Sequence, residues 1–328
     1  LAGFEQPTSG EILIDGVDVA QTPAHKRPVN TVFQSYALFP HLTVEKNVAY
    51  GLRWQKDIDR RERDAKVSRA LDLVQLTGLE SRRPHQMSGG QQQRVARARA
   101  LAIEPQVLLR DEPLSALDAK IRIVLRKEIR AIQRQLGITT VYVTHDQEEA
   151  LSLSDRVVVM SDGRIEQIGT PSEIYNFPAT AFVASFVGTL NLVTAGVIDA
   201  GSGRLSVGGQ EIRTSKRIVD AGADGRVTLA VRPEGMALGD GPAGSNHLRG
   251  EVEDINFLGS IVRIRFHLGD GTGGDAPTVL ALDTFNEPHL SVPEVGQAVT
   301  VSFPPEACFV LGAARDGALA TAEVGAEV

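Results

Sequence analysis

The first part of the chain alternates short apolar strands with amphipathic helices, and no other feature constrains the fold as strongly. The predicted strands are residues 11–14, 31–33, 106–109, 139–144 and 156–160. Apolar residues recur at helical spacing in 62–79, after Ser88 and in 119–136. The residues expected at the helix ends are the N-caps Ser88 and Asp118 and the terminating glycines Gly78 and Gly137. This alternation predicts an α/β domain with a largely parallel sheet.

After residue 186 the pattern changes, because helical periodicity disappears. Short alternating strands are predicted at 204–207, 226–231, 249–255, 261–268, 278–283 and 298–303. Glycine-rich or proline-rich turns separate them, which is typical of an all-β sandwich or small barrel. The predicted domains are therefore 1–186 and 187–312, and the Ala-, Gly- and Glu-rich stretch 313–328 is predicted to be a disordered tail.

Composition excludes several classes of protein. The formal net charge is −7, which argues against a general nucleic-acid binder or a polybasic membrane anchor. Cys308 is the only cysteine, so an internal disulfide framework is excluded and a reducing cytosol is expected. The sequence has no apolar run of about eighteen residues, the length that spans a bilayer, and no secretory signal at its start.

The segment VLLRDEP, residues 107–113, carries two adjacent carboxylates. An apolar strand that ends in Asp-Glu brings both to the carboxyl edge of the sheet, where Asp111 is placed to hold Mg²⁺ and Glu112 to act as general base toward water. Asp-Glu after a strand is also a common loop or helix-start signal. By itself the segment leaves both interpretations open.

The segment MSGGQQQRVARARAL opens a helix with Ser88, Gly89 and Gly90. Backbone N–H groups and the positive end of the helix dipole suit a γ-phosphate. The alternative is an N-capped helix with a glycine hinge, and the Gln- and Arg-rich continuation favours the phosphate interpretation.

Two further polar residues follow predicted strands. Gln34 is placed to orient a water molecule and to reach a metal, although most such glutamines are simply exposed loop residues. His145, directly after 139–144, is placed to donate to a γ-phosphate, although a lone histidine here is more often structural or capping.

Taken together, SGGQQQR, DEPLSALD and THDQEEAL resemble the nucleotide-binding subunit of ABC transporters, over residues 1–312. The resemblance implies ATP and Mg²⁺ as cofactors. By this resemblance, Gln34 contacts the metal and the attacking water, Asp111 binds the metal, Glu112 is the catalytic base and His145 is the switch histidine. The signature that closes over ATP bound to the partner subunit consists of Ser88, Gly89, Gly90 and Gln91. The loop that connects the two sites is Ser115 to Asp118.

The same resemblance implies partners and a location. We expect a homodimer with two ATP molecules between its subunits, and two transmembrane permease subunits contacted through residues 35–48. Tyr36 and Phe39 suit such a partner surface, although Phe39 could instead anchor the loop to its own domain. A periplasmic solute-binding protein would take part indirectly, no nucleic acid is expected, and the chain would be peripheral on the cytoplasmic face of the bacterial plasma (inner) membrane.

The sequence departs from the family pattern in two ways. It contains no GxxxxGK[ST] phosphate loop, so we expect roughly forty residues to be missing before Leu1, and residues 1–328 alone to bind ATP poorly and to hydrolyse almost none. Arg110 stands where the family has a small or apolar residue. We expect it to lie at the edge of the sheet, paired with a carboxylate.

The predicted architecture is therefore an ABC-type P-loop NTPase domain of α/β class, truncated at its N-terminus, followed by a small all-β OB-like (TOBE) barrel. VRPEGMAL at 231–238 resembles that accessory domain. Segments such as VNTVFQSYALFPHLTVEKNVAYGLR look closest to spermidine/putrescine import ATPases. Iron(III), sulfate/thiosulfate and aminoethylphosphonate importers are alternatives.

Two other classes of function are possible. A soluble ABC-type ATPase of DNA repair or translation usually has coiled-coil insertions or tandem nucleotide domains, and the sequence shows neither. A degenerate, non-hydrolysing module could sense a solute through Asp283, Glu287 and His289, although exposed polar loop residues need no such role.

Overall fold

The computed structural model describes residues 1–32, 37–55, 57–112, 119–215, 217–219, 221–269 and 278–313. The chain divides into two compact units, Leu1–Asp155 and Arg156–Val328. The division falls earlier in the chain than the predicted boundary between residues 186 and 187, which stays a prediction.

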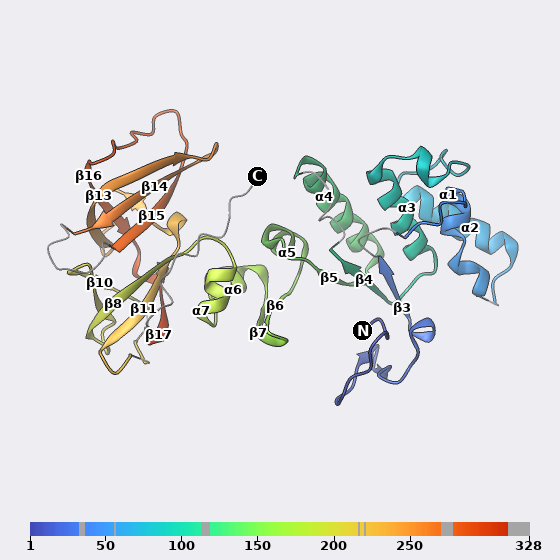
Figure 1. Ribbon diagram of the computed structural model, residues 1–328, viewed down its shortest axis with the longest axis horizontal. Coiled ribbons are helices and arrows are strands. Elements are labelled where there is room, and N and C mark those ends of the chain that lie inside the picture. The colour runs from blue at the N-terminus through green and yellow to red at the C-terminus, as the bar shows by residue number, and fades with distance from the viewer. Residues whose placement is uncertain are drawn as a thin grey trace. The chain divides into compact units, whose positions relative to one another are not determined.

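A three-stranded parallel sheet organises the first unit (Figure 1). Its strands are β3 (Val29–Val32), β4 (Val107–Asp111) and β5 (Thr139–Val143), in the order β3-β4-β5. The prediction of a parallel α/β sheet is confirmed for these strands. The predicted strand 11–14 is different, because only β1 (Leu13–Ile14) forms there. It pairs with β2 (Val17–Asp18) as an antiparallel hairpin outside the parallel sheet.

Helices α1 (Val44–Val48), α2 (Arg60–Leu73) and α3 (Gly89–Ala102) pack together beside this sheet. Their shared core consists of Val44, Val48, Leu52, Val67, Ala70, Leu71, Val74, Leu76, Met87, Val95, Ala98 and Ala102. Val95 and Ala98 of α3 are fully buried, which explains why the residues after Ser88 carry small and apolar side chains at helical spacing.

Helix α2 ends at Leu73, so the predicted end at Gly78 was wrong. Gln75 takes the left-handed conformation that usually favours glycine, with φ +57°. The N–H of Leu76 then donates to the carbonyl of Leu71 (2.9 Å), and that of Gln75 to the carbonyl of Asp72 (2.9 Å). This is a Schellman motif, and burial of Leu76 in the helical core supports it despite the non-glycine residue.

Helix α4 (Ala119–Leu136) and helix α5 (Gln147–Leu153) flank β5 in the sequence. Helix α4 ends where predicted, at Gly137 with φ +63°. Its predicted N-cap, Asp118, lies outside the described residues.

The second unit begins with an antiparallel hairpin of β6 (Val157–Ser161) and β7 (Arg164–Gly169). The predicted strand at 156–160 therefore exists but is not part of the parallel sheet. Asp162 and Gly163 both have positive φ (48° and 73°), as a tight two-residue hairpin turn requires. Helices α6 (Pro171–Asn176) and α7 (Ala181–Phe186) follow.

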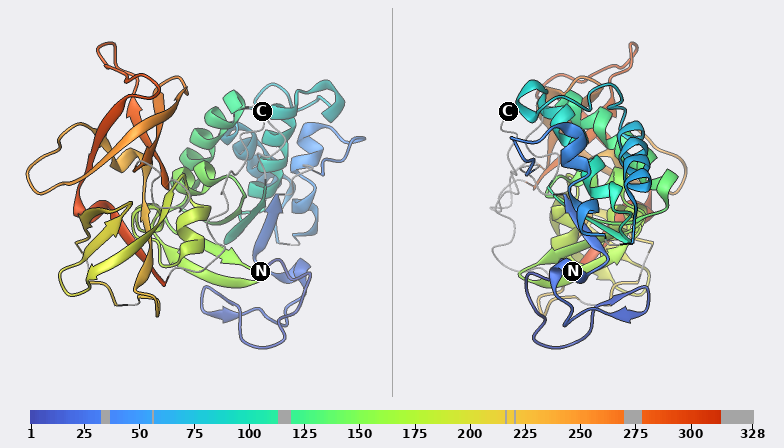
Figure 2. Two further views of the ribbon diagram at one scale, coloured as in Figure 1. Left: turned by 60° about the vertical axis from the view of Figure 1, so that its left-hand side comes forward. Right: turned by 90° about the vertical axis from the view of Figure 1, so that its right-hand side faces the viewer.

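The rest of this unit is all-β, as predicted (Figure 2). One sheet has the order β10-β9-β8-β11-β17 and the other the order β12-β16-β13-β14-β15. The strands are β8 (Asn191–Asp199), β9 (Arg204–Val207), β10 (Gln210–Arg213), β11 (Arg226–Val231), β12 (Ala237–Leu238), β13 (Asn246–Phe257), β14 (Ile261–Leu268), β15 (Thr278–Phe285), β16 (Ala298–Phe303) and β17 (Cys308–Ala313). Alternate residues of both sheets form one apolar core, in which Phe266 is fully buried and Phe303 nearly so. The sequence did not predict β8, β10, β12 or β17.

Arg232 joins β11 to the segment that precedes the β-sheets. It is 5% exposed, and its guanidinium donates to the carbonyls of Tyr175 (3.0 and 2.7 Å), Val187 (2.8 Å) and Thr189 (3.3 Å). Its charged end also lies 3.7 Å from the ring centroid of Tyr175. The VRPEG segment thus has a structural role in this unit.

Candidate functional site

The carboxyl end of β4, the central strand of the parallel sheet, presents two carboxylates. Asp111 is its last residue and is exposed, and its carboxylate forms no hydrogen bond or ion pair with the residues that the structure describes. Glu112 follows with φ +39° and donates its N–H to the carbonyl of Val143 on β5 (3.0 Å). A left-handed backbone at a non-glycine residue is strained, and such strain gathers at functional sites.

His145 reaches Glu112 from the end of the neighbouring strand. The Nδ1 atom of His145 lies 3.3 Å from Oε1 of Glu112. The side chain of His145 is 71% exposed and that of Glu112 is 36% exposed, so both remain open to a substrate. The structure therefore brings together two residues that the sequence analysis placed in one catalytic group.

The buried residue Glu149, which the sequence did not predict to be functional, stabilises the turn that contains His145. Glu149 is 2% exposed, and its Oε2 accepts hydrogen bonds from the hydroxyls of Tyr142 (2.9 Å) and Thr144 (3.0 Å). The Thr144 hydroxyl in turn accepts from the N–H of Asp146 (2.9 Å). A signal was present in THDQEEAL, since a second glutamate in the first turn of a helix after a strand can reach back to the turn.

Asp146 adds a second restraint on the same turn. Its Oδ1 accepts the N–H of Glu149 as the N-cap of α5 (3.0 Å), and its Oδ2 accepts from Arg122 and Arg126 of α4 (3.0 Å each). Because the carboxylate binds two guanidinium groups and caps a helix at once, the position of His145 next to it is firmly set.

The predicted signature residues form the start of α3. The Ser88 hydroxyl accepts from the N–H of Gln91 (3.3 Å), and the Gln91 side chain accepts from the N–H of Ser88 (3.0 Å), a reciprocal capping box. The N-capped-helix alternative thus accounts for both side chains. Apart from the adjoining residues and the backbone of α3 itself, no atom of the described residues lies within 4 Å of the position that a Cβ would take on Gly89 or Gly90, so the helix start is open to an approaching group.

Three predictions fall wholly or partly on residues that are not described. Gln34 and Asp118 lie outside the described ranges, as does the loop Ser115 to Asp118. The metal-binding and water-orienting role of Gln34 and the nucleotide-binding role of Asp118 stay predictions.

The expectation for Arg110 was wrong. Strand β4 is the middle strand of its sheet, so Arg110 is at no edge, and it is 3% exposed. Its Nε and Nη2 atoms are buried without a hydrogen-bond partner in the described part of the chain. The guanidinium instead lies 5.4 Å from the ring centroid of Tyr142.

Phe39, in the predicted permease-contact segment 35–48, is anchored within its own unit. Its ring centroid lies 4.3 Å from that of Tyr50, and Arg99 lies 5.5 Å from its ring. Asn47 accepts the Phe39 N–H (2.9 Å) and donates to its carbonyl (3.1 Å). The alternative, an anchoring role, therefore describes Phe39 better than a free partner surface does. Tyr36 lies outside the described residues.

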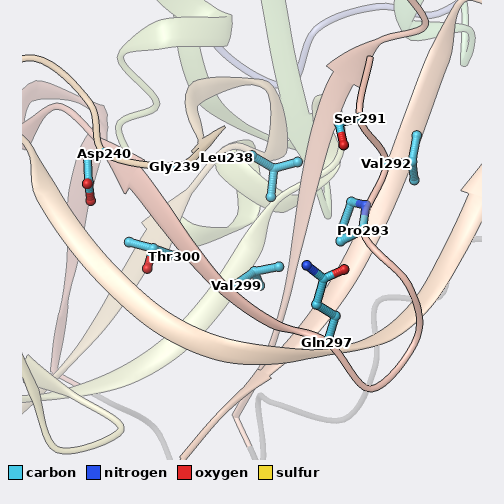
Figure 3. Close-up of a pocket in the computed structure, with 9 residues that line it drawn as sticks. All are labelled: Leu238, Gly239, Asp240, Ser291, Val292, Pro293, Gln297, Val299 and Thr300. Atoms are coloured by element: carbon cyan, nitrogen blue, oxygen red, sulfur yellow. The ribbon is translucent and has the colours of Figure 1, made fainter. Parts of the chain in front are cut away.

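The second unit contains a cavity of about 360 Å³ (Figure 3). Its lining residues are Leu238, Gly239, Asp240, Ser291, Val292, Pro293, Gln297, Val299 and Thr300. The residues considered for solute sensing, Asp283, Glu287 and His289, are not among them. Asp283 forms a two-point ion pair with Arg263 (2.7 Å for each bond), which occupies its carboxylate.

The described residues contain no group of three or more His, Cys, Asp or Glu side chains arranged to hold a metal ion. None of their helices has both the length and the apolar character needed to cross a membrane.

The chain is similar to known proteins in both of its units. The ABC transporter family model matches residues 1–115, and the TOBE domain model matches residues 229–311. The spermidine/putrescine import ATP-binding protein of Pseudomonas fluorescens is 46% identical over 297 residues, 89% of this chain and 79% of the relative. The protein of the same name from Rubrobacter xylanophilus is 43% identical over 324 residues, 96% of this chain and 82% of the relative.

A relative that is named for another solute has a similar identity. The Fe(3+) ions import ATP-binding protein 1 of Rhizobium meliloti is 49% identical over 273 residues, 83% of this chain and 76% of the relative. Identities of this size across most of both chains show that the chain and these relatives are homologous. The chain belongs to the ATP-binding proteins of the ABC transporter family, with a TOBE domain in its C-terminal part.

Proposed function

We propose that the chain is the ATP-hydrolysing subunit of an ABC importer and that it energises polyamine uptake. The observation that carries the proposal is the contact between Glu112 and His145 beside the exposed carboxylate of Asp111. A general base, a polar partner and a metal ligand are the groups that hydrolysis of a phosphoanhydride requires at one place.

In this proposal Glu112 accepts the proton of the attacking water. His145 orients the carboxylate of Glu112 through Nδ1 and presents the rest of its exposed ring to the γ-phosphate. Asp111 fits a Mg²⁺ ligand, because its carboxylate is exposed and has no described protein partner. Mg²⁺ would supply charge neutralisation on the phosphate oxygens. Gln34 would contribute to the metal and the water.

The signature would act on a second copy of the chain. Gly89 and Gly90 leave the N-terminal end of α3 open, so its N–H groups can meet a phosphate of ATP held by the partner in a homodimer. Gln91 and Ser88 would shape that end through their capping box. Asp118 would lie between the two sites.

The proposed assembly is a homodimer bound to two permease subunits, with a periplasmic solute-binding protein as an indirect partner. Residues 35–48 would meet the permease, through exposed positions such as Pro40, His41, Glu45 and Lys46 rather than through Phe39. The chain would then be peripheral on the cytoplasmic face of the plasma (inner) membrane. The relatives named as import proteins support this arrangement.

Polyamines are the first solute candidate because relatives named for spermidine and putrescine match over the longest stretches. Iron(III) is the second, since the relative named for Fe(3+) reaches 49% identity. Sulfate/thiosulfate and aminoethylphosphonate are further alternatives. Asp111, Glu112 and His145 carry no information on the transported solute, so only a transport measurement can distinguish these solutes.

The test is ATP hydrolysis by the assembled transporter, with the phosphate-loop segment expected before Leu1 included, in the variant Glu112→Gln, which keeps the shape of the side chain and removes the base. We expect a loss of about 10²- to 10⁴-fold in kcat. Asp64→Asn, on the exposed face of α2, is the matched control and should leave the rate unchanged. Normal hydrolysis by Glu112→Gln would refute the assignment. Uptake of labelled spermidine, compared with iron(III), by cells that depend on this transporter decides the solute.

A further inference from the structure

Two buried arginines face one small cavity in the first unit. Arg97 on α3 is 2% exposed and Arg110 on β4 is 3% exposed. The cavity has a volume of about 20 Å³. The other residues that line it are Leu101, Leu108, Ile129, Ile132, Gln133, Leu136, Ile138 and Thr140.

Most nitrogens of these two guanidinium groups have no hydrogen-bond partner among the described residues. All three nitrogens of Arg97, and Nε and Nη2 of Arg110, are buried and unpaired within the described ranges. Another buried arginine shows how such N–H groups are usually satisfied. Arg27 donates to the carbonyls of Leu1, Ala20 and Thr22 at 2.7 to 3.0 Å. A buried N–H left without an acceptor costs about 1–3 kcal/mol, and more when it is charged, so five such nitrogens require an explanation.

The neighbouring carboxylates are engaged elsewhere. Oε1 of Glu128 lies 2.6 Å from Nη2 of Arg94, while its Oε2 lies 3.9 Å from Nη1 of Arg97, which is too far for a hydrogen bond. Glu149, the carboxylate that acts on Arg110 at longer range, accepts the hydroxyls of Tyr142 and Thr144 instead. Around the cavity the described side chains therefore bring more positive than negative charge.

Both arginines remain cations under ordinary conditions. Burial lowers the pKa of Arg97 to about 9, with the charge of Arg110 adding to the effect and that of Glu128 opposing it. This value is above neutral pH. Burial also lowers the pKa of Arg110, but an arginine side chain is not known to lose its proton in proteins. Two like charges thus face one cavity.

We propose that this cavity is an anion site that binds a single chloride-sized ion between Arg97 and Arg110. A cavity of about 20 Å³ has room for a single small ion and excludes phosphate or a carboxylate, so a monatomic halide is the anion that suits it. A water molecule could accept at most two of the N–H groups and would offset no charge. A halide accepts several and neutralises one of the two cations.

The position of the site joins two functional elements. Helix α3 begins after Ser88, and strand β4 ends in Asp111. An anion held by one arginine from each would fix this helix against this strand. The inference does not depend on the proposed function, because it rests on burial and on unpaired donors.

The test compares the unfolding of the chain in sodium chloride, sodium bromide and sodium gluconate at one ionic strength. Gluconate is too large for the cavity. We expect the folding equilibrium constant to rise about tenfold for each tenfold rise in halide concentration above its Kd. Arg110→Leu, which removes one cation, should lose this response. Arg69→Leu, an exposed arginine on α2, should keep it. Equal halide responses in the native chain and in Arg110→Leu would overturn the proposal.

A second measurement does not depend on any variant. Crystals of the native chain soaked in bromide should give an anomalous peak between Arg97 and Arg110. Density there without anomalous signal would identify a water molecule and overturn the proposal. A bromide peak without any halide effect on stability would mean an adventitious ion only, and would overturn it as well.

Discussion

Asn47 holds the loop in front of α1, and its replacement by alanine should destabilise the first unit. The side chain is fully buried. Its Oδ1 accepts the N–H of Phe39 (2.9 Å), and its Nδ2 donates to the carbonyls of Phe39 (3.1 Å), Leu42 (3.2 Å) and Thr43 (3.0 Å). One amide thus closes a whole turn of backbone.

The magnitude follows from which partners Asn47→Ala leaves unsatisfied. The Phe39 carbonyl keeps the N–H of Leu42 (3.1 Å), and the Thr43 carbonyl keeps the N–H of residue 47 itself (2.8 Å). The Phe39 N–H and the Leu42 carbonyl have no second partner among the described residues. Two orphaned groups at about 1–3 kcal/mol each give a loss of roughly 4 kcal/mol, within a range of about 2 to 6 kcal/mol.

The assay is urea unfolding followed by circular dichroism, with amide exchange at Phe39 as the local probe. Asn47→Ala should lower the unfolding free energy by about 4 kcal/mol and expose the Phe39 N–H to exchange. Asn176→Ala, whose side chain is exposed and donates only to Ser172, is the control and should stay within about 0.5 kcal/mol of the native chain. If Asn47→Ala behaves like the control, the closure of the loop by this amide is refuted.

Three further predictions concern buried polar groups. Burial raises the pKa of the Cys308 thiol to about 12 from an ordinary value near 9, so the folded state holds a proton that the unfolded state has lost between these values. The unfolding free energy should therefore fall by up to about 1.4 kcal/mol per pH unit as pH rises from about 9 to 12, and Cys308→Ala should show a shallower fall in urea titrations. Arg232→Ala removes the bonds to three carbonyls and the contact with the Tyr175 ring, and should cost about 3–5 kcal/mol in the same measurement; a loss below about 1 kcal/mol would contradict the anchoring role. Tyr142→Phe removes one of two donors to Glu149 and should cost about 1–2 kcal/mol by thermal unfolding. An unchanged melting temperature would show that the second donor suffices.

The α/β and all-β fold classes were predictable because hydrophobic periodicity is local. The parallel strands and the open β-sheets follow directly from alternating and helical patterns in the sequence, and most of their bounds agree with the structure. The misplaced strands were those whose partner could not be inferred. Val157–Ser161 was assigned to the parallel sheet, although the turn of Asp162 and Gly163 was available as a hairpin signal.

Helix ends and buried charges depend on tertiary context and were less predictable. Gln75 ends α2 in a conformation that favours glycine because Leu76 gains burial, and no local pattern shows that gain. Arg110 was expected at an edge of the sheet because the order of strands in a sheet cannot be read from the sequence of one strand. For the candidate site, residue types and spacing placed Asp111, Glu112 and His145 at neighbouring strand ends. The left-handed backbone of Glu112 and the hydrogen bonds that Glu149 accepts could be recognised only from the structure.

The double pairing of Asp146 has a mechanical consequence. Arg122 and Arg126 lie in the first two turns of α4, while Asp146 begins α5 and follows His145 directly. One carboxylate therefore joins the N-terminal part of α4 to the turn that carries His145. Separating the two would break both ion pairs at once, so we expect the start of α4 and the histidine turn to move together.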